Sequence, residues 1–184
     1  AGTLPPIDFE DEELETMGVR TLEEYTWKDL LDAQACIKCG RCQENCPAYL
    51  SGKELSPMHF IQSIAQQNKE RGNILLHVSE EERSEEQNAL LEEGVVGTVI
   101  SEDALWQCTT CRACSEECPA RIIHPEKDIK ARTYQVCMES AFPPEAQQTF
   151  RNLETNGNPW GIGWQKRIDW TRELDVPTIE ENPT

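Results

Sequence analysis

The sequence predicts a mainly α-helical fold organised around two cysteine-rich loops. Three observations predict it: helix-start signals recur along the 184 residues, the alternation typical of β-strands is nearly absent, and two runs share the spacing C-x2-C-x2-C-x3-C-P. Hydrophobic residues make up only 38% of the chain. A large apolar core is therefore not expected, and part of the fold must be stabilised by something other than apolar burial.

The first predicted domain, residues 1–20, is an acidic, proline-containing arm. Two stretches that follow it, "TLEE" at 21–24 and "TWKD" at 26–29, resemble capping boxes, in which the first and fourth side chains bond each other's backbone at a helix start. Short helices are therefore expected to lead into the first cysteine run. In the second of them, three apolar residues are spaced to form one buried face: Trp27, Leu30 and Leu31.

Between the cysteine runs, the clearest helix signal begins at Ser56, an N-cap residue followed by Pro57, and ends before Gly72. The acidic stretch 79–93 is either a second helix or a mobile segment, and 94–100 offers at most a short strand or hairpin. The long helix is expected to bury one apolar face, made of Phe60, Ile61 and Ile64.

The chain is expected to enter the second cysteine run through a turn capped by Ser101. Beyond this run, Pro125 starts a predicted helix that ends near Ser140, and a further helix covers 144–156 before Gly157. The second predicted domain is residues 21–142, and the third is a C-terminal helix with an aromatic tail over 143–184. The inward side chains of the Pro125 helix are expected to be Ile129, Val136 and Cys137.

Eight of the nine cysteines lie in the two runs, and an odd total with this clustering indicates metal binding in place of disulfides. Each cysteine of the first run recurs 72 positions later, which suggests two half-sites in a pseudo-twofold arrangement. The pairs are Cys36 and Cys108, Cys39 and Cys111, Cys42 and Cys114, and Cys46 and Cys118.

This spacing fits a 4Fe–4S cluster, a cube whose four iron corners each take one thiolate. Three cysteines at i, i+3 and i+6 can wrap three corners, while the fourth lies one helical turn on and can reach the other cluster, as in two-cluster ferredoxins. We therefore expect two 4Fe–4S clusters with crossed ligands. The first is assigned Cys36, Cys39, Cys42 and Cys118, and the second Cys108, Cys111, Cys114 and Cys46.

Two other functions compete with electron transfer by such clusters. Structural zinc sites use two separated C-x2-C pairs, a pattern that these runs do not follow. A catalytic iron–sulfur enzyme needs one iron corner without a cysteine, whereas eight matched cysteines leave none open. The sequence therefore predicts an electron carrier without catalytic residues of its own.

The formal charge of −17 argues against nucleic acid as a partner, because phosphates would be repelled. Four cations lie near the cysteines in the sequence. They either have a role in tuning the reduction potentials or in docking, or they are solvated loop residues: Lys38, Arg41, Arg112 and Arg121. The remaining candidates are expected to be structural: Cys137 as a small buried residue, and His59, His77 and His124 as structural or exposed groups. Trp160, in the turn at 158–161, either covers a hydrophobic surface or contacts a partner.

The sequence resembles the heterodisulfide reductase-like iron–sulfur oxidoreductases, in particular the membrane-associated members that move electrons between electron-transferring flavoprotein and a quinone pool. The resemblance extends over roughly 8–170 and rests on "LWQCTTCRACSEECP", on "DFEDEELETMGVRTLEEYTWKDLLDAQACIKCGRCQENCPAY" and on "CMESAFPPEAQQTFRNLETNGNPWG". It implies an α-helical ferredoxin fold with two 4Fe–4S clusters.

The resemblance also implies partners. They are electron-transferring flavoprotein or another flavin donor, and either a membrane haem and quinone part or a cysteine-rich disulfide-reducing part, on the same polypeptide or on a separate subunit. No flavin or nicotinamide fingerprint is visible, so the electrons are expected to come from a partner. The chain is expected to be an excised domain, or alternatively a separate electron carrier like the small iron–sulfur subunit of heterodisulfide reductase. We expect it to be cytoplasmic, at the cytoplasmic face of a membrane through an N-terminal part outside this sequence.

Overall fold

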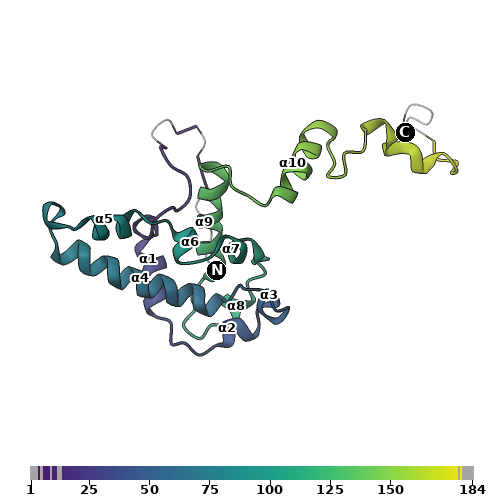
Figure 1. The fold of residues 1–184 in the computed structure, drawn as a ribbon. Helices are drawn as coiled ribbons and strands as arrows, with labels where there is room; N and C mark the ends of the chain where they lie inside the picture. Colours follow the sequence, from purple (N-terminus) through teal and green to yellow (C-terminus); the bar gives the residue numbers. More distant parts are fainter. Residues whose placement is uncertain (1–3, 5, 9, 12–13, 178, 180–184) are drawn as a thin grey trace. The chain divides into compact units, whose positions relative to one another are not determined.

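The computed structural model describes residues 4, 6–8, 10–11, 14–177 and 179, and these form two units that are described separately (Figure 1). The units are Ala1–Ala141 and Phe142–Thr184. The predicted domains 1–20, 21–142 and 143–184 stay a prediction, and their two ends lie partly outside the described residues. The described residues contain no β-strand, only one isolated bridge between Val96 and Ile100, which confirms the mainly α prediction.

The first unit contains helices of very different lengths. The longer ones are α1 (Trp27–Gln34), α4 (Pro57–His77), α5 (Glu85–Glu92), α7 (Glu102–Gln107) and α9 (His124–Cys137). The one-turn helices are η1 (Leu22–Glu24), α2 (Arg41–Glu44), α3 (Pro47–Leu50), η2 (Glu80–Glu82), α6 (Val95–Thr98) and α8 (Ala113–Glu116).

Side-chain caps fix where α1, α4 and α7 begin. Thr26 and Asp29 form the capping box predicted for α1, Ser56 accepts a hydrogen bond from the His59 amide, and Ser101 accepts one from the Ala104 amide. The capping box predicted at 21–24 is wrong, because the Thr21 side chain makes no capping hydrogen bond to η1. A local sequence pattern was therefore sufficient to predict where α1, α4 and α7 begin.

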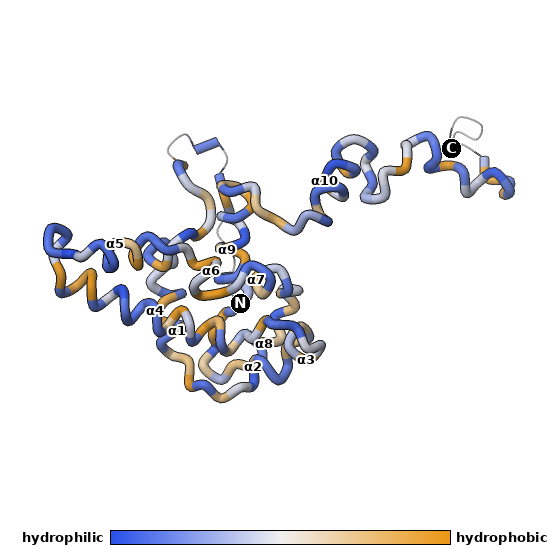
Figure 2. Tube along the Cα trace, viewed as in Figure 1, coloured by the Kyte–Doolittle hydropathy of each residue, from blue (hydrophilic) through white to orange (hydrophobic). Residues whose placement is uncertain are grey.

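The core lies where α1, α4, α6 and α7 meet, and Figure 2 shows hydrophobic residues gathered there. The predicted apolar face of α4 is confirmed, since Phe60, Ile61 and Ile64 are buried. The face predicted for α1 is only partly right: Leu30 is partly buried and packs against the core, but Trp27 is 76% exposed and Leu31 is 54% exposed. The buried cluster includes Leu22, Tyr25, Ala33, Val95, Leu105, Ile122 and Ala131.

Three further expectations about elements are corrected. The long helix continues through Gly72 to His77, because a glycine inside a packed helix weakens it without ending it. The stretch 94–100 forms no strand: it contains the one-turn α6, in which Val96 and Gly97 have non-helical backbone angles, and an isolated bridge joins Val96 to Ile100. Near the end of α9, Val136 and Cys137 are exposed, so the expected inward face does not extend that far.

A buried ion-pair network joins α1 to α9. The fully buried Lys127 ammonium lies 3.0 Å from the Asp32 carboxylate and 3.3 Å from that of Asp29, which also pairs with Lys130 at 2.5 Å. Burial raises the pKa of Asp29 and Asp32, but bonds and charges from the lysines outweigh it and lower both pKa values. The network therefore stabilises the fold above about pH 4, and this stabilisation is lost as pH falls through the folded-state pKa.

The Lys127→Met variant is expected to unfold more easily, with a free energy of unfolding lower by about 3 kcal/mol, because it leaves two buried carboxylates short of a counter-charge. The measurement is the urea midpoint of the anaerobic iron-loaded protein by far-ultraviolet circular dichroism. The control is Lys28→Met, since Lys28 pairs with Asp32 from a half-exposed position and is expected to matter by less than about 1 kcal/mol. Equal midpoints for the two variants would contradict the prediction.

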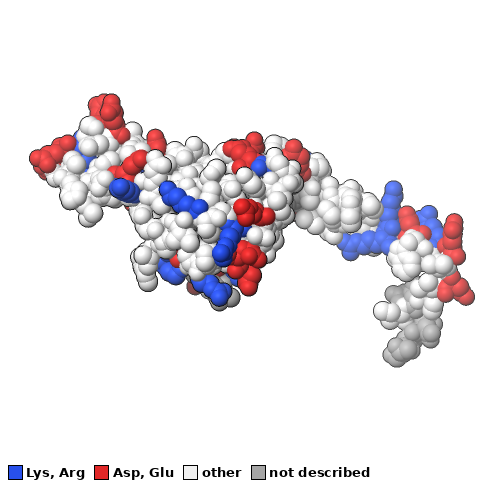
Figure 3. Space-filling model, turned by 90° about the horizontal axis from the view of Figure 1, so that it is seen from below, with Lys and Arg blue, Asp and Glu red and all other residues white. Residues whose placement is uncertain are grey.

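A second buried cation anchors the acidic end of this unit. Arg71 of α4 is 1% exposed; it pairs with Glu23 at 2.8 Å and donates to the Glu93 carbonyl at 2.6 Å. The segment after α4 forms η2 and α5, so the helical alternative for 79–93 is confirmed. Figure 3 shows Asp and Glu side chains gathered at this end, whereas acidic and basic side chains are interspersed over the rest of this unit in the face in view.

The second unit contains α10 (Pro144–Asn156) and η3 (Trp164–Thr171). Gly157 ends α10 in the left-handed conformation, with φ +65°, as predicted. In the turn that follows, the Asn158 side chain bonds the backbone of Ile162 from both of its polar atoms, and Trp160 is 77% exposed. No described helix of either unit is long and apolar enough to cross a membrane.

Candidate iron–sulfur centres

The two cysteine loops have the same backbone conformation at equivalent positions. Lys38 and Thr110 have φ of +56° and +54°, and Gly40 and Arg112 have φ of +82° and +67°. Non-glycine residues adopt this left-handed region only when the surrounding structure compensates the strain. Such conformations turn successive backbone amides toward the inside of a loop, where they can stabilise an anion.

Each loop continues into a one-turn helix that carries its third cysteine. Cys42 lies in α2 and Cys114 lies in α8, and both thiols are buried at 8% exposure. Helix α2 packs against α8, and each of them also packs against the long helix that follows its own cysteine run, α4 or α9. The arrangement is therefore the predicted pseudo-twofold repeat, with the two loops side by side.

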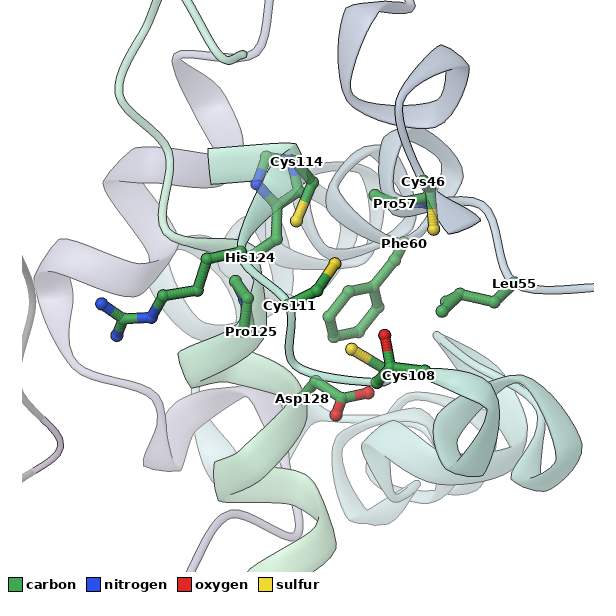
Figure 4. Close-up of a pocket in the computed structure, with 12 residues that line it drawn as sticks. Cys46, Leu55, Pro57, Phe60, Cys108, Cys111, Cys114, His124, Pro125 and Asp128 are labelled. Carbon is green, nitrogen blue, oxygen red and sulfur yellow. The ribbon is translucent and has the colours of Figure 1, made fainter. Parts of the chain in front are cut away.

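The first cavity, called here the Cys108 cavity, has a volume of about 440 Å³, including space open to solvent. Cys108, Cys111 and Cys114 of the second run border it together with Cys46 of the first run. Figure 4 shows these four thiols around the cavity, with the carboxyl group of Asp128 near Cys108.

The second cavity, called the Cys36 cavity, has a volume of about 310 Å³, again including space open to solvent. Its border contains Cys36, Cys39 and Cys42 of the first run and Cys118 of the second. The structure thus brings together the two crossed sets that the spacing predicts; that these eight thiols are the ligands stays a prediction. Within the described part of the chain, no three His, Cys, Asp or Glu side chains converge tightly enough for a single metal ion.

The fourth cysteine of each run changes sides because a proline follows it. Cys46 is the N-cap of α3, and Pro47 occupies the first position of that helix. Cys118 precedes Pro119 in a tight turn in which the Arg121 amide donates to the Cys118 carbonyl at 3.0 Å. Both turns direct the fourth thiol away from its own loop and toward the neighbouring one.

The charge balance of the cavities suits a cationic iron–sulfide core. Burial raises the pKa of Cys42 to about 11, assisted by the charges of Cys36 and Cys118, and it raises the pKa of Cys114 to about 12, assisted mainly by Cys108. Thiols with such pKa values bind as thiolates only when a metal supplies positive charge. Four thiols per cavity, two of them buried in the Cys108 cavity, fit a 4Fe–4S cluster in donor type and number.

Residues of α9 support the entrance to the second loop. Arg132 donates to the Cys108 carbonyl at 2.8 Å, lies 5.1 Å from the centre of the Trp106 ring, and pairs with Asp128 at 3.0 Å. Burial raises the pKa of Asp128 to about 7, although Arg132 opposes the shift. Sequence reasoning missed both residues; their i, i+4 spacing in "HPEKDIKAR" is the only signal that pointed to them.

The remaining residues that the sequence singled out differ in their exposure to solvent. Cys137 is exposed and outside both cavities, so its predicted burial is wrong. His124 is 4% exposed, and burial lowers its pKa to about 4. The four cations of the cysteine loops are exposed, and Arg112 pairs with Glu126 at 3.3 Å. Whether these cations have a tuning or docking role or are solvated loop residues stays a prediction with both alternatives open: Lys38, Arg41, Arg112 and Arg121.

Residues 32–122, which include both cysteine runs, match the family described as the 4Fe-4S dicluster domain. Three observations now define the class of protein: the helical fold, the two cavities with four cysteines each, and this family match. The chain is a two-cluster iron–sulfur protein whose cofactors are two 4Fe–4S clusters.

Relatives narrow the class further. The chain is 42% identical to the EtfAB:quinone oxidoreductase of Syntrophomonas wolfei subsp. wolfei over 90% of its own length and 25% of that protein. It is 36% identical to a probable iron-sulfur-binding oxidoreductase of Bacillus subtilis over 98% of this chain and 29% of that one. It is 32% identical to an iron-sulfur subunit of the CoB--CoM heterodisulfide reductase of Methanopyrus kandleri over 50% of this chain and 33% of that subunit.

The chain is therefore homologous to heterodisulfide reductase-like iron–sulfur oxidoreductases, and with its 4Fe-4S dicluster domain it fits electron relay. It spans little more than a quarter of the length of the first two relatives.

Proposed function

We propose that this chain relays single electrons through its two clusters from a reduced flavoprotein to the quinone-reducing part of a larger oxidoreductase. The observation that carries the proposal is that four cysteines border each cavity. With one thiolate for every iron corner, no corner is left for a substrate. The proposed ligands are Cys36, Cys39, Cys42 and Cys118 for one cluster, and Cys108, Cys111, Cys114 and Cys46 for the other.

The chain's own residues hold the two sites next to each other. Cys46 and Cys118 each tie one loop to the other, and the contact between α2 and α8 keeps the cavities adjacent. Arg132 fixes the carbonyl of Cys108, and the Thr110 amide donates to the Cys108 sulfur at 3.4 Å. When bound, each cluster takes up and releases one electron.

The names of the relatives support the choice of donor and acceptor. The Syntrophomonas relative is named for electron-transferring flavoprotein and quinone, and it is similar to this chain over 90% of the chain's length. Because quinones dissolve in the bilayer, we propose that the module works at the cytoplasmic face of a membrane, held there by another part of the same oxidoreductase.

The test uses the chain purified without air. Iron and acid-labile sulfide are measured first, and the protein is then titrated with dithionite while visible absorption and electron paramagnetic resonance (EPR) are recorded. We expect a brown protein, bleaching on reduction, and signals from two interacting 4Fe–4S centres. Rapid mixing with reduced electron-transferring flavoprotein is then expected to bleach the same absorption. A colourless zinc protein, or a cluster with an open corner that binds a small molecule, would overturn the proposal.

A second candidate is a separate small subunit that feeds electrons to a disulfide-reducing partner. The similarity to the heterodisulfide reductase iron-sulfur subunit of Methanopyrus kandleri favours it. The two candidates differ in the acceptor. Reoxidation of the reduced chain by a quinone-reducing membrane fraction supports the first, whereas reoxidation only by a cysteine-rich disulfide reductase supports the second.

A further inference from the structure

One side chain lies in the wall of both cavities. Among the residues that the structure describes, His124 alone borders the Cys108 cavity and also the Cys36 cavity. It is the first residue of α9 and is 4% exposed, so it belongs to the interior between the two sites. Figure 4 shows its ring at the edge of the Cys108 cavity.

One contact of the ring and one of the backbone hold His124 in place. The ring Nδ1 lies 3.1 Å from the carbonyl oxygen of Ile122, which is 1% exposed. The backbone amide of His124 donates at 3.3 Å to the hydroxyl of Ser115, the residue after Cys114 in α8. Pro125 follows directly and restricts the backbone at the start of α9. The imidazole is therefore a pre-positioned polar group between the sites.

Polar groups near a cluster influence its reduction potential. Reduction adds one negative charge, and the free energy of that charge depends on hydrogen bonds, dipoles and burial around the sulfurs. Most of the cavity walls differ between the sites: Phe60 and Asp128 border only the Cys108 cavity, and Met58 and Ile122 border only the Cys36 cavity. A residue in only one wall acts mainly on one cluster, whereas a shared residue acts on both.

We propose that His124 is a shared tuning residue of the electron relay, a polar group in the walls of both cavities whose removal changes the reduction potentials of both clusters. The inference rests on the proposed function with its crossed ligands. Because the Ile122 carbonyl can only accept, Nδ1 carries the ring proton and Nε2 keeps its lone pair. An apolar ring of similar size removes this dipole from both walls, so both potentials are expected to change when the imidazole is removed.

The test compares redox titrations, followed by EPR, of the iron-loaded chain and of His124→Phe. We expect unchanged iron and sulfide content and a shift of both midpoints, with a smaller shift of both in His124→Gln. The matched controls are Thr109→Val and Met58→Leu, because each of these residues borders one cavity. Each control is expected to shift one midpoint.

A shift confined to one cluster in His124→Phe, or no shift in either, would overturn the inference. If His124→Phe loses iron, His124→Gln decides by the same criterion. If both variants lose iron, His124 is needed to hold the sites and the tuning role is rejected. If the parent chain itself shows no pair of reducible clusters, the proposed function fails instead, so the two failures are distinguishable.

Discussion

In the Cys46→Ser variant, the cluster in the Cys108 cavity is expected to be lost or to become a three-iron species, although Cys46 belongs to the other run. The reason is that Cys46 borders that cavity, is 7% exposed, and does not border the cavity of its own run. Iron is expected to fall from about eight atoms per chain to between about four and seven. The EPR signal of the cluster in the Cys36 cavity should remain, but it should no longer show magnetic interaction with a second cluster.

Two controls accompany this variant. Cys118→Ser should give the reciprocal result, damage to the cluster in the Cys36 cavity. Cys137→Ser should leave iron, sulfide and both signals unchanged, because Cys137 is exposed and borders neither cavity. Loss of the cluster in the Cys36 cavity from Cys46→Ser would show that each run binds its own cluster and that the crossed assignment is wrong.

Removal of the iron is expected to unfold the cysteine loops, the largest conformational effect that we anticipate. Helices α2, α3 and α8 have four residues each and are too short to be stable alone. Their loops also contain residues with positive φ, a strain that bound metal offsets. Hydrogen exchange of the anaerobic apoprotein should show lost protection over 36–50 and 108–118, because metal binding and folding are coupled.

The same experiment contains its own control. Helix α4 is held by Ile61, Ile64 and Arg71, none of which contacts a cavity, so it should stay the best-protected element. Reconstitution with ferrous iron and sulfide should restore protection in the loops. Unchanged exchange over both loops in the apoprotein would contradict the view that metal supplies part of the folding energy.

The sequence was informative where chemistry is local. Capping residues such as Thr26, Ser56 and Ser101 act within one turn, so their helices could be predicted from a few residues. The cysteine spacing predicted which thiols would share a cavity, because a cubic cluster limits the reach of a short loop.

Predictions failed where tertiary packing decides. The spacing of Trp27 and Leu31 suits an amphipathic helix, but α1 instead buries Asp29 and Asp32 against lysines of α9, which no periodicity rule anticipates. Nothing in the sequence distinguishes His124 from an ordinary structural or exposed residue, because its position between two cavities arises from segments far apart in the sequence.

The crossed borders of the cavities also have a consequence for biosynthesis. Chains leave the ribosome N-terminus first, so Cys36, Cys39 and Cys42 emerge long before Cys118, the thiol proposed to complete their site. Under that ligation, neither centre can be finished on a nascent half-chain, and a polypeptide truncated before residue 114 would present two incomplete sites to the assembly machinery. Cofactor insertion then becomes a checkpoint on translation of both cysteine runs.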